Sequence, residues 1–243
     1  MKKIWCFCFS FVLLSFAHSQ EQYFNLPGKT IKWAATGLLL GDISIQGEYN
    51  LKNRHSLTAK VGIPVAVRHT IQYQERDVEF TMRASSFLIG YRTYFADTHL
   101  AGLYLEPYCK YVQHQSKGIG FGKLGGKPIV YDFSNRYQGT GFGIQLGYQL
   151  LLKEKLIVDI FFFGPEINSS INNFRAEEIS QTISWTEGEA KEAETVTRDF
   201  INRFPFIKNK ADVRVNREKR IIYADFMGAL PGIRTGVSIG LAF

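Results

Sequence analysis

The sequence predicts an all-β fold, an eight-stranded antiparallel transmembrane β-barrel with a long, partly helical last loop. Two observations support this prediction. Segments of about ten residues, in which apolar side chains alternate with polar or small ones, recur along the chain between turn residues. The connections between these segments are alternately short and long, which is typical of barrels that cross a membrane. A closed sheet leaves no unpaired strand edge facing lipid.

The first residues predict a secretory signal peptide that precedes the barrel. Lys2 and Lys3 come before an apolar run over 4–16, and Ala17-His18-Ser19 forms a small-x-small site, so we expect cleavage after residue 19. The run is shorter than the roughly 20 apolar residues that a spanning helix needs. The mature chain, 20–243, then keeps Cys109 as its one cysteine, which excludes a disulfide framework and a cysteine metal cluster.

The first four strands are predicted over 30–37, 42–51, 55–67 and 82–95. The third shows the pattern clearly, because Leu57, Ala59 and Val61 alternate with Thr58 and Lys60. Turn residues lie at 41–42, 52–54 and 96–98, and a polar stretch over 68–80 precedes the fourth strand.

The last four strands are predicted over 100–115, 136–150, 156–164 and 232–243. A glycine-rich loop over 116–135 separates the fifth strand from the sixth, and 153–155 is a short turn. The aromatic run 161–163 blurs the alternation in the seventh strand. The long last loop then covers 168–231.

The two faces of these strands differ in chemistry. One face is aliphatic, with aromatic side chains near the segment ends, and the other is polar or small and carries charges of both signs. Such a charged face suits a narrow lumen filled by ion pairs. The alternative to a membrane barrel is a soluble, secreted β-sandwich. We predict a lumen charge network formed by Lys32, Glu48, Lys60, Arg92, Glu106, Lys110, Asp159 and Arg234.

The last strand resembles the assembly signal of outer-membrane barrels. Val237, Ile239, Leu241 and Phe243 share one face, and the chain ends on the aromatic Phe243. The resemblance implies that these four residues are recognised by the barrel-assembly machinery.

The mature chain as a whole resembles small outer-membrane barrels of the OmpA/OmpX type. The segments RYQG at 136–139, with Gly143, and GYQ at 147–149 resemble a hairpin strand in a family of uncharacterised outer-membrane proteins, and GYRTYF at 90–95 resembles another strand of that family. The likeness covers 31–167 and 232–243. It implies the outer membrane of a Gram-negative bacterium, with outer-membrane lipid and lipopolysaccharide as partners, and no assigned activity.

One pair of side chains suggests an enzyme. His114 and Ser116 lie on one face of a strand and resemble the His and Ser of outer-membrane lipid A deacylases, which are eight-stranded barrels. In those enzymes the pair faces lipid at the outer rim, with an acid to orient the histidine. Here the alternation places His114 on the lumen side with Lys110, and Lys117 stands where the family has Asn.

Other motifs predict no cofactor, no metal and no nucleic acid. The segment 120–125 fits G-x-G-x-x-G but opens no helix, so a flexible loop is the better interpretation. The histidines show no metal-ligand spacing. Without Lys2 and Lys3 the excess of basic over acidic side chains falls from seven to five, and it forms no nucleic-acid footprint.

The last loop is divided by charge. Acidic residues dominate 177–199 and basic residues dominate 203–220. Ser184 and Glu187 predict a helix capping box, and Val196, Phe200 and Phe204 then recur at helical spacing. The loop could form a self-paired subdomain on the rim, a surface recognition element, or a plug folded into the lumen.

These observations predict a non-enzymatic barrel protein. It would support envelope structure or bind an extracellular partner through 168–231. Lipid A modification by His114 and Ser116 is one alternative, and a small-solute channel is another, although an eight-stranded lumen is too narrow for a general pore.

Overall fold

The structure is a computed structural model that describes residues 27–52, 54–73, 76–96 and 100–243. The predicted signal peptide lies outside the described residues. The helices are α2 (Gly37–Leu40) and α3 (Glu187–Ile201). The strands are β1 (Lys29–Ala34), β2 (Asp42–Lys52), β3 (His55–Pro64), β4 (Val67–Tyr73), β5 (Arg76–Tyr94), β6 (Gly102–Leu124), β7 (Lys127–Leu152), β8 (Leu156–Glu178), β9 (Asp212–Asn216) and β10 (Ile221–Ala242).

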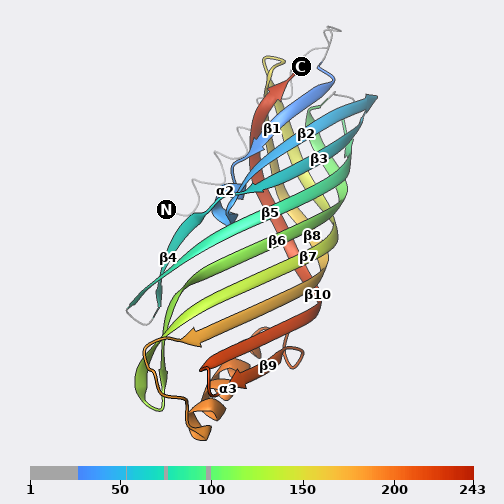
Figure 1. Cartoon of the computed structure of the whole chain (residues 1–243). Coiled ribbons are helices and arrows are strands. Elements are labelled where there is room, and N and C mark those ends of the chain that lie inside the picture. The colour runs from blue at the N-terminus through green and yellow to red at the C-terminus, as the bar shows by residue number, and fades with distance from the viewer. Residues whose placement is uncertain (1–26, 53, 74–75, 97–99) are drawn as a thin grey trace, which may run out of the picture.

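Eight of these strands close into an antiparallel ring, which confirms the predicted fold class. The ring runs β1-β2-β3-β5-β6-β7-β8-β10, and β10 pairs with β1 to close it. At the closure Trp33 lies between Ile45 of β2 and Ile239 of β10. The strands tilt across the ring, with α3 and β9 at one end and the C-terminus at the other (Figure 1).

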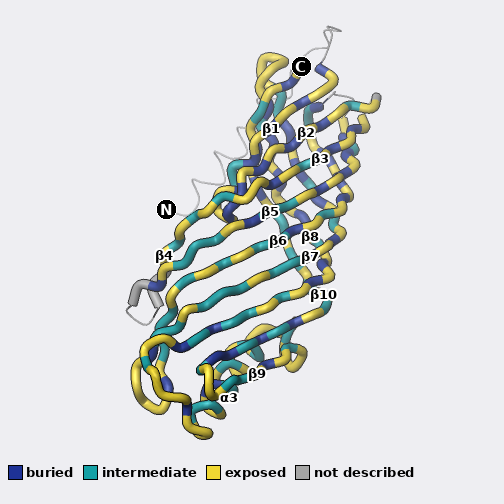
Figure 2. The backbone as a smooth tube through the Cα atoms, viewed as in Figure 1, coloured by how far each residue is buried: buried dark blue, intermediate teal, exposed yellow. Residues whose placement is uncertain are grey.

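Burial alternates along the strands because side chains point to opposite faces of a sheet. Along the strands around the ring, exposed residues alternate with buried or intermediate ones (Figure 2). The outer face carries exposed aliphatic and aromatic side chains, here called the apolar belt, which include the predicted assembly-signal residues Val237, Ile239, Leu241 and Phe243. The inner face carries buried polar side chains such as Lys32, Gln46 and Arg92.

Toward α3 and β9 the strands are longer than the sequence predicted. The predicted loop 116–135 is a hairpin, because β6 continues to Leu124 and β7 starts at Lys127. Gly125 and Gly126 make its turn, with φ of 57° and 74°, as a two-residue hairpin turn of the primed type requires. Both ends of the predicted loop 168–231 are also strand, because β8 continues to Glu178 and β10 starts at Ile221.

A β-bulge in β8 changes which residues face the lumen. Phe161 pairs with Gly147 while Phe163 pairs with Leu146, so β8 holds one extra residue at this point. The register with β10 shifts at the same place. Phe162 and Phe163 are therefore both exposed, and the inward positions change from odd numbers to even numbers.

The ring is closed in the half that holds the C-terminus and open in the other half. β1 ends at Ala34, short of the predicted residue 37, and the chain turns through α2 toward β5. The Gly41 carbonyl accepts hydrogen bonds from the backbone N–H groups of Val65 and Ala84. Within the described chain, no strand pairs with the β1-side edge of β10 between Phe226 and Val237. The outer half is thus an open sheet with β4 and β9 at its edges.

No helix in the described part of the chain has the length and apolar composition to span a membrane.

Candidate functional site

Five of the eight predicted lumen residues form one buried network in the closed half of the barrel. The Lys32 ammonium lies 2.8 Å from Glu48 and 2.8 Å from Asp159. Arg92 contacts the same two carboxylates at 3.3 and 3.0 Å and Glu106 at 2.7 Å. These side chains are at most 1% exposed. Because they come from β1, β2, β5, β6 and β8, the network crosses the lumen.

Uncharged side chains complete the hydrogen bonding of this network. Lys32 donates its third hydrogen bond to Gln149, at 2.7 Å. Four hydroxyl groups donate to the three carboxylates at 2.5–2.7 Å, those of Ser56, Thr58, Tyr94 and Tyr104. The Arg92 guanidinium also lies 3.6 Å from the centre of the Tyr104 ring. Buried charges are tolerated only when they are paired and hydrogen-bonded in this way, so the network fixes its members and fills the inner lumen.

The three remaining predicted residues, Lys60, Lys110 and Arg234, lie in a separate outer cavity. This cavity has a volume of about 320 Å³ and is bounded by α2, β10 and the inner faces of β3, β5 and β6. Lys110 lies 2.5 Å from Glu166. Arg234 donates to Gln145 at 2.8 Å, and its guanidinium lies 4.7 Å from the centre of the Phe161 ring. The structure therefore divides the eight residues between a filled inner lumen and an open outer cavity.

Two carboxylates of the outer cavity were missed by sequence reasoning. Glu166 lies beyond the predicted end of its strand, and the bulge in β8 turns it inward, where it also accepts a hydrogen bond from Tyr108 at 2.8 Å. Asp42 belongs to the predicted turn 41–42 and also starts the predicted strand 42–51, but it was not counted among the lumen charges; it starts β2 and accepts a hydrogen bond from Ser44 at 2.6 Å. Asp42 could have been found from strand alternation, whereas Glu166 could not.

His114 and Ser116 lie on the inner face of β6. His114 borders the outer cavity with Lys110, and its ring packs against Tyr137 with centroids 5.9 Å apart. Across the described residues, no carboxylate is hydrogen-bonded to the His114 ring. The arrangement of His114 and Ser116 therefore differs from that of the lipid A deacylases, whose His and Ser face lipid and have an acid that orients the histidine.

The segment between β8 and β10 forms a subdomain with its own apolar core. α3 and β9 cover the ends of the long strands, and the core is made of Leu124, Ile129, Trp185, Ala193, Val213, Ile222 and Ala224. Arg198 of α3 donates to the Val213 carbonyl at 2.9 Å, and the Gly125 N–H donates to Glu192 at 2.9 Å. The outer subdomain, defined as residues 179–219, is therefore packed on the β6–β7 hairpin and on β10.

A capping box starts α3, two residues after the predicted position. Thr186, rather than Ser184, is the N-cap, and its hydroxyl accepts from the Glu189 N–H at 3.2 Å. Glu189 accepts from the Thr186 N–H at 2.8 Å, and this backbone hydrogen bond lowers the pKa of Glu189 below its ordinary value of 4.5. The helix therefore starts directly after Trp185, which is buried in the subdomain core.

Large apolar side chains remain exposed on the other side of the outer subdomain. Val196, Phe200, Phe204 and Phe206, here called the aromatic ridge, are 48–58% exposed. The rings of Phe200 and Phe204 pack edge to face with centroids 5.5 Å apart. Arg203, Lys208 and Lys210 are exposed beside the ridge. Large apolar patches that are exposed on a protein surface often mark interaction sites.

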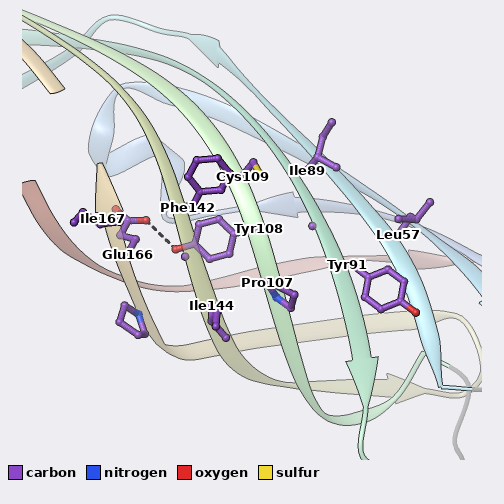
Figure 3. A pocket seen from close by; sticks show the side chains of 13 residues that line it. Leu57, Ile89, Tyr91, Pro107, Tyr108, Cys109, Phe142, Ile144, Glu166 and Ile167 are labelled. Atoms are coloured by element: carbon purple, nitrogen blue, oxygen red, sulfur yellow. Dashed lines mark hydrogen bonds between the residues drawn. The ribbon is translucent and has the colours of Figure 1, made fainter. Parts of the chain in front are cut away.

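A second surface feature lies in the apolar belt. The short side chains of Pro107 and Cys109 on β6 lie between larger ones and form the floor of a groove of about 760 Å³. Ile89, Leu57 and Tyr91 stand on one side of it and Phe142, Ile144 and Ile167 on the other (Figure 3). Tyr108 is bonded to Glu166 on the inner side of the same wall (Figure 3).

The described residues contain no cluster of three or more His, Cys, Asp or Glu side chains that could hold a metal ion.

Comparisons with known proteins give a family and similarity to solved structures. A search of curated proteins finds no match to this chain. The crystal structure of CarO from Acinetobacter baumannii is 9% identical, with a TM-score of 0.39, and the likeness covers 92% of this chain and 100% of that one. The family model described as "Protein of unknown function (DUF3575)" matches residues 7–164. That match covers more than half of the chain, and the protein therefore belongs to the DUF3575 family.

Proposed function

We propose that the protein is a non-enzymatic barrel of the bacterial outer membrane that presents its outer subdomain to a protein partner at the cell surface. The aromatic ridge is the observation that carries this proposal. Burying four large apolar side chains against a partner would be favourable: complete burial of an exposed side chain contributes about 1.5–3 kcal/mol, and about half of each of these is still exposed. Other apolar side chains of the same segment, such as Trp185 and Ala193, are buried in a core. The exposure of the ridge is therefore not a sign that the segment is poorly folded.

The chemistry around the ridge defines the partner. Arg203, Lys208 and Lys210 are exposed and lie close in the sequence to Phe204 and Phe206, so the complementary surface would carry apolar side chains together with acidic residues. Aromatic and arginine side chains are also the residue types that contribute most to binding energy at protein interfaces.

The barrel itself serves as a closed membrane anchor in this proposal. The inner lumen holds the buried network of Lys32, Arg92 and three carboxylates, which supports a barrel without discrete conductance. The exposed apolar belt supports a membrane location, and the predicted signal peptide and the sequence resemblance to outer-membrane barrels support the outer membrane.

The first test combines surface proteolysis with gel mobility. Intact cells are treated with trypsin, and the membrane protein is run with and without heating. We expect cleavage within 191–210 and a core whose mobility changes on heating. A protein that shows no heat shift would contradict the barrel anchor, and a subdomain that stays uncut on intact cells would contradict its surface exposure.

The second test probes the ridge directly. A photo-crosslinking amino acid at Phe200 should give a discrete adduct with a surface protein, and the same probe at Ile239, in the apolar belt, should not. Changing Val196, Phe204 and Phe206 to Ser should abolish the adduct. An adduct of equal yield in that variant would disprove the role of the ridge.

A further inference from the structure

Outward-facing cations lie directly beyond the apolar belt on β5, β6 and β7. The register places Arg83 beside Gln115, Gln115 beside Arg136, and Arg136 beside Asn173. Lys117 lies one outward position further along β6. Arg83, Lys117 and Arg136, here called the basic patch, are all exposed. Toward the membrane the same faces carry Phe87 and Tyr111, which are 45% and 41% exposed.

The charges of this patch are not neutralised within the protein. In the described chain, none of its three side chains forms an ion pair with a carboxylate. With the side-chain amides turned so that oxygen faces the guanidinium, Arg136 lies 3.1 Å from Gln113 and 3.0 Å from Gln138, and both groups are neutral. Neighbouring Arg175 and Arg214, by contrast, are paired with Glu177 and Asp225.

The surface beside the patch is hollowed and rich in hydrogen-bonding groups. A depression of about 390 Å³ is bordered by Arg136, Lys117, Gln115, Ser134 and Asn173. Asp225 also borders it, where its carboxylate is paired with Arg214 and accepts a hydrogen bond from Asn173. Amides and hydroxyls beside unpaired cations suit a ligand that carries both sugar hydroxyls and phosphate groups.

The distance between the basic patch and the groove in the apolar belt fits one leaflet of a membrane. Cys109, on the groove floor, and Gln115, beside the patch, are six residues apart on β6, which is about 20 Å along the strand. With a strand tilt of about 40°, this corresponds to about 15 Å along the membrane normal. That is half of the roughly 30 Å hydrocarbon thickness, so the groove and the patch together span one leaflet.

We propose that this surface binds one phosphorylated, acylated glycolipid of the outer leaflet, of the lipid A type. Its phosphates contact Arg83, Lys117 and Arg136, its sugar hydroxyls meet Gln115 and Asn173, and one acyl chain lies in the groove over Pro107 and Cys109. This inference rests on the proposed outer-membrane location and is independent of the partner proposed for the aromatic ridge.

The test is native mass spectrometry of the full-length mature protein in detergent, with purified lipid A as the probe. Lipid A should bind. Changing Arg83, Lys117 and Arg136 together to Gln should weaken binding about one hundredfold, because each cation near an anionic lipid surface raises the affinity roughly fivefold. Dephosphorylated lipid A should bind the wild-type protein as weakly as lipid A binds the variant. Excess inorganic phosphate should not displace lipid A, since the phosphate alone lacks the acyl chain.

Controls separate charge from position. Changing Lys123, Lys127 and Lys191 to Gln removes the same charge at the tip of the molecule and should leave lipid A binding unchanged. Cys109→Phe fills the groove at a lipid-facing position and should weaken binding of lipid A severalfold.

Equal lipid A affinity in the basic-patch variant and the wild-type protein, or equal binding of lipid A and dephosphorylated lipid A to the wild-type protein, would overturn the inference. Each variant is also checked for its heat-dependent gel shift, so failure of the barrel anchor is detected separately.

Discussion

Arg92 is the side chain on which the inner lumen most depends. It is buried and contacts Glu48, Glu106 and Asp159. Arg92→Met would leave three buried carboxylates with Lys32 as their main cation, and breaking a buried ion pair in this way costs about 3–5 kcal/mol. We expect the variant to lose its folded gel mobility at a clearly lower temperature and lower urea concentration than the wild-type protein.

Two further variants make this prediction specific. Arg175→Met removes an arginine whose ion pair with Glu177 is 40% and 36% exposed, so its effect should stay within about 1 kcal/mol. Adding Glu106→Gln to Arg92→Met removes one stranded charge and should restore part of the stability. Equal unfolding of Arg92→Met and Arg175→Met would show that the network contributes little.

Strand alternation predicts inward side chains well where a strand is regular. Lys32, Glu48, Arg92 and Glu106 belong to regular strands and meet in the lumen. Tyr94 and Gln149 lie at inward positions too, but selecting only charged residues left them out. Glu166 lies beyond a bulge, where a single inserted residue reverses the alternation. The aromatic run 161–163 blurs the pattern at this place but does not show that the inward positions change.

At the scale of the element, the capping box determines how well α3 is held. The Thr186 hydroxyl satisfies the Glu189 N–H, one of the free donors at the start of the helix. Thr186→Ala should destabilise α3 by about 1 kcal/mol, which corresponds to roughly fivefold faster exchange of its amide hydrogens. Exchange in the paired strands β6 and β7 should not change. Ser184→Ala, at the residue that the sequence pattern first suggested, is the matched control and should have little effect on the helix.

The same element should respond to acid. The pKa of Glu189 is lowered because its carboxylate accepts the Thr186 backbone hydrogen bond. A carboxyl group with a lowered pKa in the folded state adds stability above its ordinary pKa, and this stability is lost as the pH falls through the folded value. Amide exchange in α3, corrected for its intrinsic pH dependence, should therefore accelerate as the pH falls below 4.5. Glu189→Gln should lack this acid step, and an unchanged step in that variant would assign it to another group.

The connections were the hardest elements to predict, for a physical reason. Inside a membrane one strand face must be apolar, so the pattern identifies strands such as β3 and the end of β10. Beyond the apolar belt both faces can be polar, and the alternation fades. The outer parts of β6, β7 and β8 therefore looked like loops in the sequence, although they are paired throughout. The turn at Gly125 and Gly126 was the one local signal of that hairpin.

At the scale of the whole molecule, the structure combines a barrel and an outer subdomain that depend on each other to different degrees. The β8–β10 ladder extends to the pair Glu177–Ile221 and is held at its end by the Glu178–Arg220 ion pair. None of these contacts requires residues 179–219. The subdomain, in contrast, needs Leu124, Ile129 and Ile222 of the barrel strands to complete its core.

This asymmetry predicts the result of replacing residues 179–219 with Asn-Gly, a two-residue turn that joins antiparallel strands. The barrel should keep its heat-dependent gel shift, because the ring and the lumen network are unchanged. Leu124, Ile129 and Ile222 should lose their cover, so binding of a fluorescent dye that reports exposed apolar surface should rise. Lipid A binding at the basic patch should persist, whereas surface crosslinking through the ridge should be lost. A shortened protein that fails to form a heat-modifiable barrel would show instead that the subdomain is needed to fold the open outer half of the sheet.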